Sequence, residues 1–303
     1  MIYTVTLNPA FDKEITVSGF VRGNLNIIKK RRRDLGGKGI NVSKILTEMG
    51  LENEAIIIAG ENDLEEVKKE LKKYGIKNRI IINNNSYTRE NIKLYDENSH
   101  EITEINEKGN NIPEKIFSEF NEYYKNSVCE NDIIILSGSL PPDTDENIYF
   151  NLIKTAKERK SHVILDTSGK RLEKALKAFP DLIKPNEKEI SEILYGNITK
   201  NIEKIRKDSI NMLISMGEKG FLYISEKEEW KVSSFEVNVK NTVGAGDSLL
   251  AGFIYGITKT GNTKEALKYA RACATAKVTT EGSGIPDSGK INFYYKNEGI
   301  ERL

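Results

Sequence analysis

Strand and helix patterns alternate along much of this chain, and that alternation restricts its fold more than any other feature. A helical pattern at 113–125 is followed by an apolar run at 133–136, and a helix, a strand pattern at 162–166 and another helix repeat the unit. Short continuous apolar runs separated by helices are typical of parallel strands buried on both faces. The sequence therefore predicts an α/β fold with a mostly parallel central sheet and helices on both sides.

Other segments of the chain extend this pattern. Helices are expected over 62–74, with Asn62 as the N-cap, and over 263–278, and further strands are expected at 3–7, 55–59, 80–82, 182–183, 211–215, 221–224 and 230–239. Two regions, about 12–34 and 86–106, lack helix signals and contain β-like stretches around polar turns. We expect these two regions to form a small sheet of their own, outside the main one.

Composition excludes several function classes. The 303 residues contain 46 Lys+Arg and 45 Asp+Glu, so no global charge attracts a nucleic acid, and the basic run Lys29–Arg33 is interpreted as a solvated face. The chain has two cysteines and two isolated histidines, which argues against a disulfide scaffold and a histidine-based metal site. No apolar run has membrane-spanning length and no signal peptide is evident, so a cytoplasmic protein is expected.

The loop Asn241–Ser248 precedes the apolar helical run 249–257 and contains Gly244-Ala245-Gly246. A helix start with almost no side chains presents free N–H groups and the positive end of the helix dipole, which together favour a phosphate. Asp247 is unexpected there, because a carboxylate repels a phosphate. It is either an acid that the dipole favours or a base that takes a proton from an attacking hydroxyl, and we favour the base.

A second glycine-rich turn, Gly36-Gly37-Lys38-Gly39, leads into another helical pattern that Gly50 closes. One or two of these glycines are explained by a tight turn, but three around a lysine indicate close approach of the backbone to a ligand. Asn41 lies on the first turn of the helix and can donate or accept a hydrogen bond.

Further polar residues follow predicted strands, at the edge where α/β sheets bind ligands. Asp12 is either a turn acid or an acceptor for hydroxyls, and Arg89 is either a surface residue or a phosphate clamp. Asn186 and Glu189 share a face at a helix start, where they form a capping box or hold water around Mg²⁺. An anion cradle, a carboxylate and cationic side chains at one edge indicate phosphoryl transfer to a hydroxyl.

The chain resembles ribokinase-like sugar kinases of the PfkB family over its whole length. The resemblance rests on five stretches: 4–9, 36–41, 137–141, 184–186 with Glu189, and 242–248. It implies one kinase domain over 1–303, a three-layer sandwich with a mostly parallel central sheet, and a small β-sheet lid. Within the family, the 1-phosphofructokinases are most similar and the tagatose-6-phosphate kinases come next.

The resemblance also implies a role for each matching residue. Asp247 would be the base, and the N–H groups of Gly244, Ala245 and Gly246 would hold the transferring phosphoryl group. Asp12, Gly37 and Asn41 would bind the sugar hydroxyls, and Lys38, Arg89 and Ser139 would bind the substrate phosphate. Lys184, Asn186 and Glu189 would bind the ATP phosphates and water-bound Mg²⁺. Ser215, Gly217 and Gly220 would line the nucleotide site.

The expected reaction is ATP-dependent phosphorylation of D-fructose 1-phosphate to fructose 1,6-bisphosphate, in a homodimer paired through the lid. Four alternatives remain: a tagatose-6-phosphate kinase, an adenosine- or ribose-type kinase, a phosphosugar-binding regulator without turnover, and a nucleic-acid binder resting on Lys29–Arg33. We expect no nucleic-acid or membrane partner.

Overall fold

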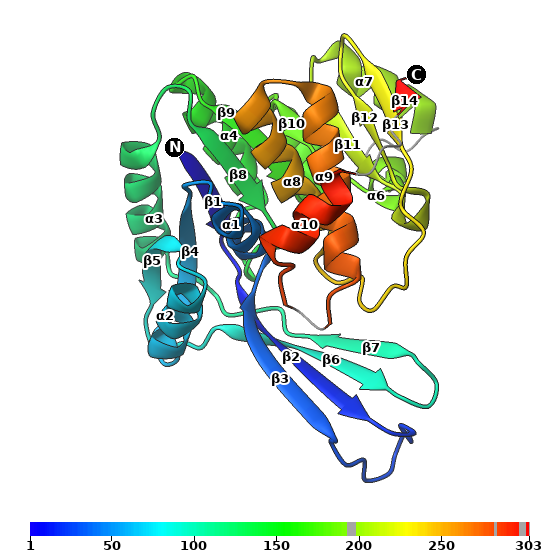
Figure 1. Cartoon of the computed structure of the whole chain (residues 1–303). Helices are drawn as coiled ribbons and strands as arrows, with labels where there is room; N and C mark the ends of the chain where they lie inside the picture. The colour runs from blue at the N-terminus through cyan, green and yellow to red at the C-terminus, as the bar shows by residue number, and fades with distance from the viewer. Residues whose placement is uncertain (193–197, 282–283, 297–300, 303) are drawn as a thin grey trace.

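The computed structural model describes residues 1–192, 198–281, 284–296 and 301–302. A ten-stranded sheet forms the centre of the described part, and a separate four-stranded sheet lies beside it (Figure 1). The large sheet has the spatial order β14 (Glu301–Arg302), β13 (Glu229–Val232), β12 (Phe221–Ile224), β11 (Asn211–Ser215), β10 (Leu182–Ile183), β9 (His162–Asp166), β8 (Ile133–Ser137), β1 (Ile2–Thr6), β4 (Glu54–Gly60) and β5 (Lys77–Asn83). Strands β11 to β5 in that order are parallel, and β12 to β14 pair antiparallel.

Helices cover both faces of the large sheet and make three layers, as Figure 1 shows. One face carries α3 (Glu114–Ser127), α4 (Ile148–Glu158), α5 (Lys170–Leu176), α6 (Glu187–Glu192) and α7 (Ile198–Lys207). The other carries α1 (Lys38–Glu48), α2 (Leu64–Lys73), α8 (Ala245–Thr260) and α9 (Thr263–Val278), and α10 (Ser288–Tyr295) packs on α9. A short 3-10 turn, η1 (Gly217–Lys219), follows β11. Among the described helices, none combines the length and the hydropathy that a membrane crossing requires.

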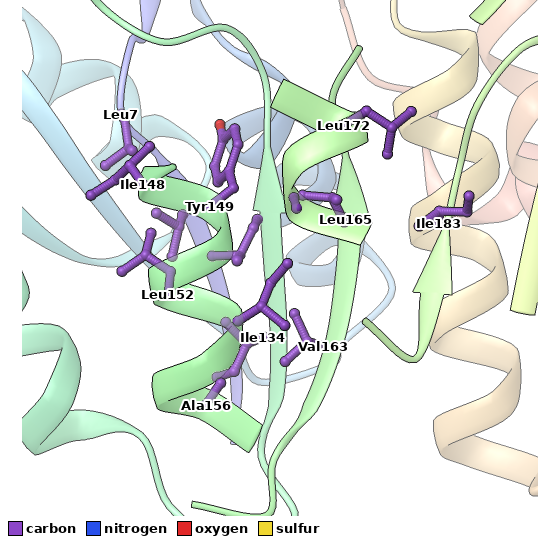
Figure 2. Close-up of a cluster of buried hydrophobic side chains, with 14 of the residues drawn as sticks. Leu7, Ile134, Ile148, Tyr149, Leu152, Ala156, Val163, Leu165, Leu172 and Ile183 are labelled. Carbon is purple, nitrogen blue, oxygen red and sulfur yellow. The ribbon is translucent and has the colours of Figure 1, made fainter. Parts of the chain in front are cut away.

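The alternation of side chains along each strand divides the core between the two faces. In Figure 2, Ile134 of β8 and Val163 and Leu165 of β9 lie against Tyr149 and Leu152 of α4. The intervening residues of the same strands face the opposite layer of helices. Because both faces are covered, the strands read as continuous apolar runs, and full burial stabilises each large side chain by about 1.5–3 kcal/mol.

The small sheet has the order β3 (Lys30–Gly36), β2 (Ala10–Val17), β6 (Arg89–Asp96) and β7 (Ile102–Asn106). Strands β2 and β6 are parallel, whereas β2–β3 and β6–β7 are antiparallel. Strand β1 leads into β2 through residues 7–9 alone, so the small sheet begins at the carboxyl edge of the large one. The expected fold, with its second small sheet, is confirmed.

Two local expectations are wrong. The helix expected from Asn62 begins at Leu64 with Asp63 at the N-cap, and the Asp63 carboxylate accepts from the backbone N–H and the hydroxyl of Thr88 instead of capping the helix. The strand expected over 230–239 ends at Val232, because Val232 pairs with Phe221, the first residue of β12, and no partner continues beyond that point.

Candidate active site

The carboxyl edge of the parallel strands and the facing small sheet enclose a cavity of about 470 Å³. That size suits a small phosphorylated metabolite. Eight of the residues expected at the site line it: Asp12, Gly37, Lys38, Asn41, Arg89, Ser139, Glu189 and Asp247. Residues from both ends of the sequence are thus brought to one place.

The loop before α8 has the form of an anion cradle. Gly244 is the N-cap residue, with φ of +77° in the left-handed region, and α8 begins at Ala245. The Ala245 N–H donates to the Thr242 carbonyl at 3.1 Å and closes the turn. The N–H groups of Gly246 and Asp247 lie in the first helical turn, where no intrahelical acceptor exists. Of the expected donors, Gly246 is therefore free while Ala245 is already used, and the Asp247 N–H is a donor that was not expected.

Asp247 is held in a buried position at this cradle, with 8% of its surface exposed. Its carboxylate accepts a hydrogen bond of 2.8 Å from Asn41 Nδ2. Burial and the negative charge of Asp166 raise the pKa of Asp247, while Lys38 and Asn41 oppose that rise. A carboxylate with a raised pKa is a stronger base, which favours the catalytic interpretation over simple capping.

Asp166, which sequence reasoning missed, is the most buried carboxylate of the site at 1% exposure. It ends β9 and forms ion pairs with Lys38 at 2.7 Å and Lys184 at 3.2 Å. Burial alone would raise the pKa of Asp166, but Lys184 and Lys38 together hold it below its usual value. The sequence did contain a signal for Asp166, because an acid at the carboxyl end of a buried parallel strand lies at the edge where α/β sheets bind ligands.

Lys38 therefore has carboxylate partners before any ligand arrives. Burial would lower the pKa of Lys38, yet Asp166 and Asp247 raise it, so its ammonium stays charged. The expected contact of Lys38 with a substrate phosphate stays a prediction.

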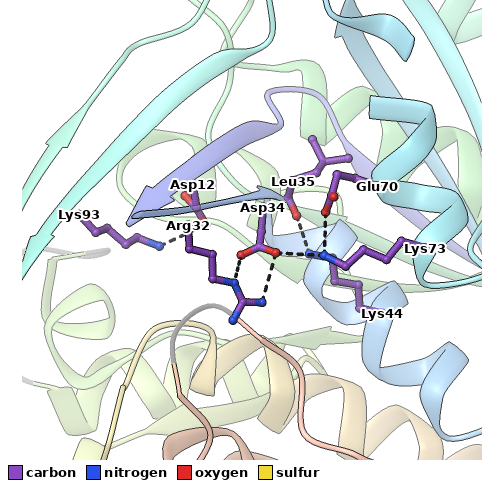
Figure 3. Close-up of polar contacts among 8 residues, drawn as sticks. All are labelled: Asp12, Arg32, Asp34, Leu35, Lys44, Glu70, Lys73 and Lys93. Carbon is purple, nitrogen blue, oxygen red and sulfur yellow. Dashed lines mark hydrogen bonds and ion pairs between the residues drawn. The ribbon is translucent and has the colours of Figure 1, made fainter. Parts of the chain in front are cut away.

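Asp12 faces the cavity from β2. Its carboxylate accepts from Asn91 Nδ2 at 3.1 Å and pairs with Lys93 Nζ at 3.1 Å, both on the neighbouring strand β6. Asn91 and Lys93 also line the cavity. They were not predicted from the sequence, because their proximity to Asp12 depends on the register between β2 and β6. Figure 3 shows Lys93 beside Asp12.

The base of the small sheet is fixed to the main body by a second polar cluster, also drawn in Figure 3. Asp34 of β3 pairs with Arg32 and, at 3.3 Å, with Lys73 of α2. Lys44 of α1 donates to the Leu35 carbonyl at 2.5 Å, and burial lowers the pKa of Lys44 to about 8. These contacts hold the end of β3 just before the Gly36–Gly39 turn.

Arg89 and Ser139 form one polar corner of the cavity. The Arg89 guanidinium donates to the carbonyls of Asn8 at 3.2 Å and Glu107 at 2.8 Å, and Nη2 lies 3.4 Å from Ser139 Oγ. Asn8 Nδ2 donates to the same Ser139 hydroxyl at 3.1 Å. Burial lowers the pKa of Arg89, because it disfavours the charged guanidinium. An anionic ligand would stabilise this cation, which the hydrogen bonds already orient.

The glycines of the first turn have a different explanation from the expected one. A Cβ on Gly37 would lie 2.8 Å from Thr6 Cγ2, and one on Gly39 would overlap Thr6 Oγ1. These glycines let α1 pack closely on β1, so the interpretation of three ligand-approaching glycines is wrong for Gly39. Gly37 does line the cavity, with φ of +123°.

Asn186 and Glu189 form the capping box reciprocally. The Asn186 N–H donates to Glu189 Oε2 at 2.9 Å, and the Glu189 N–H donates to Asn186 Oδ1 at 2.8 Å. Glu189 also lines the cavity, so the structural role does not displace a functional one.

Ser215 is the last residue of β11 and Gly217 the first of η1, and neither lines the cavity. Gly220 has φ of +94°, and a Cβ there would overlap the Val232 carbonyl. The close approach of β13 thus explains Gly220 without a nucleotide.

Comparison with known proteins identifies the family. A family model described as "pfkB family carbohydrate kinase" matches residues 5–289. The chain belongs to the pfkB family of carbohydrate kinases. It is a phosphotransferase that uses a sugar hydroxyl as acceptor and ATP as donor.

Named relatives of this carbohydrate kinase cover nearly its whole length. It is 35% identical over 284 residues to a 1-phosphofructokinase of Borreliella burgdorferi, with 91% of each chain covered. It is 29% identical over 306 residues to a tagatose-6-phosphate kinase of Staphylococcus epidermidis, with 98% of each covered. A solved structure named possible 1-phosphofructokinase, from Thermotoga maritima, has a TM-score of 0.88 and 29% identity, covering 100% of this chain and 99% of that one.

Proposed function

We propose that this kinase converts D-fructose 1-phosphate and ATP into fructose 1,6-bisphosphate and ADP. The observation that carries the proposal is that one cavity contains both a buried base at a helix-start anion cradle, Asp247, and a separate cationic corner, Arg89 with Ser139. A phosphosugar kinase needs two anion sites, one for the group transferred and one for the phosphate already present. Relatives named 1-phosphofructokinase, at 30–35% identity, support the choice of sugar.

In the proposed reaction, Asp247 takes the proton from the sugar hydroxyl as its oxygen forms a bond to the γ-phosphorus. The bond from that phosphorus to the ADP oxygen breaks, and ADP leaves with the electron pair. The free N–H groups of Gly246 and Asp247 stabilise the charge on the transferring group. Asp12, Gly37 and Asn41 bind the sugar hydroxyls, while Lys38, Arg89 and Ser139 bind its phosphate.

The nucleotide is proposed to lie toward Lys184, Asn186, Ser215, Gly217 and Gly220. In the described part of the chain, no group of three His, Cys, Asp or Glu side chains could hold a metal by itself. Mg²⁺ fits this arrangement, because it keeps several waters and takes one or two carboxylates plus substrate phosphates. Glu189 would hold it through water and neutralise phosphate charge.

We propose a single kinase domain over 1–303, in which the small sheet acts as a lid and mediates a homodimer, in the cytoplasm. The exposed apolar side chains of Ile102 and Ile105 on the edge strand β7 support pairing through this sheet. Sedimentation velocity would test the dimer, and Ile105→Glu should shift the population to monomer while Asn106→Asp should not.

A coupled assay of ADP release with fructose 1-phosphate, fructose 6-phosphate and tagatose 6-phosphate tests the substrate. We expect the highest kcat/KM for fructose 1-phosphate. Equal or better turnover of tagatose 6-phosphate would overturn the choice of sugar and indicate a tagatose-6-phosphate kinase instead. Binding of phosphosugars without any ADP release would instead indicate a regulator.

A further inference from the structure

Arg171 is a cationic side chain at the site, and within the described part of the chain it forms no ion pair, although its charge helps to lower the pKa of the exposed Glu146. It lies in the first turn of α5, directly after β9 and its Asp166-Thr167-Ser168 loop, and it lines the same cavity as Gly138 and Ser139. Its Nε is buried and has no hydrogen-bond partner. Among the described residues, no carboxylate lies within ion-pair distance of its guanidinium, whereas Lys38 and Lys184 both have Asp166.

The neighbours of Arg171 place its charge on one wall of the cavity. Burial raises the pKa of the Tyr149 hydroxyl, and the positive charge of Arg171 partly offsets that rise. The same hydroxyl donates to the carbonyls of Ser137 at 3.0 Å and Gly138 at 3.1 Å. Arg171, Gly138, Ser139 and Arg89 line the same cavity, and Ser139 Oγ lies 3.4 Å from Arg89 Nη2.

An arginine without a partner in such a place is costly unless a ligand completes it. Arg171 is half-buried, and its buried Nε has lost water as a partner, a loss that is recovered only when an acceptor arrives. The planar guanidinium presents several donors in a fixed fork that matches the oxygens of a phosphate dianion. The cationic corner already described contains one such fork, from Arg89, and a hydroxyl.

We propose that Arg171 is a second guanidinium for the phosphate already carried by the sugar, and that it sets the preference for phosphorylated over unphosphorylated sugars. This inference rests on the proposed function of the site and deepens it. Arg89, from the small sheet, and Arg171, from the main body, then hold one phosphate from two different parts of the fold. The phosphate meets two guanidinium groups only when both arginines are present, in addition to the ammonium of Lys38.

The test compares Arg171→Gln and Arg171→Lys with the wild type. Lys170→Gln is the matched control, because Lys170 is the preceding residue of α5, is exposed and does not line the cavity. For Arg171→Gln we expect the KM for fructose 1-phosphate to rise roughly 10- to 100-fold, as for loss of a charge-assisted hydrogen bond. The KM for ATP should change less than about twofold, and Arg171→Lys should recover part of the loss, because it keeps the charge without the fork.

The ratio of kcat/KM for fructose 1-phosphate to that for fructose should fall in Arg171→Gln and stay unchanged in Lys170→Gln. An unchanged sugar KM in Arg171→Gln would overturn the proposal. A rise in the ATP KM without a rise in the sugar KM would also overturn it, and would assign Arg171 to the nucleotide.

Calorimetric titration of fructose 1-phosphate in the absence of ATP separates this inference from the proposed function. If the wild type turns over no phosphosugar, the proposed function fails, but Arg171 is still tested by binding. Weaker binding to Arg171→Gln, by about tenfold or more with the melting temperature kept, supports the assignment, and equal binding contradicts it.

Discussion

Two glycine-rich turns lead into helices at this site, and the physical reasons for their glycines differ. Before and within α1, a Cβ on Gly37 or Gly39 would collide with Thr6 of the adjacent strand β1. In the first turn of α8, a Cβ on Gly246 would meet only the Nζ end of the flexible Lys184 side chain, at 3.1 Å. The first turn is shaped by packing within the protein, and the second leaves space for something outside it.

A glycine motif alone therefore does not identify a ligand loop. Both turns precede a buried helix and look alike in sequence, but only the surroundings of each Cβ distinguish a packing constraint from an open cradle. The two turns nevertheless meet at one point, since Asn41 of α1 donates to Asp247 of α8.

The largest effect is expected from Asp247→Asn at the open turn. An amide keeps the shape but cannot take a proton, so kcat should fall by about 10²–10⁴. Because burial and Asp166 raise the pKa of Asp247, removing its charge should leave the melting temperature unchanged or raise it. Steady-state kinetics and thermal unfolding measure both. A nearly normal kcat would remove the catalytic role of this residue.

The glycines themselves provide a paired test. Gly246→Ala should lower kcat by roughly one to two orders of magnitude, because a methyl group enters the cradle, while stability stays unchanged or rises by about 0.5–1 kcal/mol from helix propensity. Gly39→Ala should instead lower the free energy of unfolding by about 1–3 kcal/mol through overpacking.

Urea unfolding measures the stability of both variants, and steady-state kinetics measures their kcat. Adding Thr6→Ala to the Gly39→Ala variant should recover part of the lost stability. If Gly39→Ala kept its stability and lost only activity, the distinction between the two turns would be wrong.

Asp166 connects the two turns, since it pairs with Lys38 of the first and with Lys184 beside the second. Its negative charge helps to raise the pKa of Asp247, so Asp166→Asn should move the acidic limb of the kcat/KM profile to lower pH. The exposed Asp208→Asn serves as the control. A limb that stays in place or moves to higher pH would show that Asp166 does not act on the base.

The effect expected to influence activity least concerns the packed turn, through the stability contributed by Lys44 of α1. Its folded pKa of about 8 lies below the unfolded value near 10.4, so between those pH values the unfolded chain binds a proton that the folded chain does not. Stability therefore rises with pH across that window, by up to roughly 3 kcal/mol. Lys44→Met should reduce this slope in urea titrations at several pH values, and the exposed Lys264→Met should leave it unchanged.

The sequence predicted the regular elements better than their surroundings. The bounds of β9 and α9 match the expected ranges, because continuous apolar runs and helical periodicity are local signals. The start of α2 was misplaced because Asp63 is engaged by Thr88, a contact between distant segments. Strand pairing likewise decided where β13 ends, and no pattern within 230–239 records that.

The candidate site was predicted in outline by motif, but its electrostatics were not. Eight expected residues line the cavity, whereas Asp166 was overlooked at the end of a strand whose apolar part was read correctly. Asn91 and Lys93 could not be found from sequence, since their meeting with Asp12 depends on the register between β2 and β6.

The direct passage from β1 to β2 has a consequence for any motion of the small sheet. Strand β1 is clamped between β8 and β4 in the middle of the large sheet, and only residues 7–9 separate it from the strand that carries Asp12. With so little slack, the small sheet cannot swing as a free flap: it must pivot close to Asn8, which also touches Ser139. Any rotation of the small sheet would thus be centred next to the pocket, where even a modest rotation changes the contacts with a bound sugar.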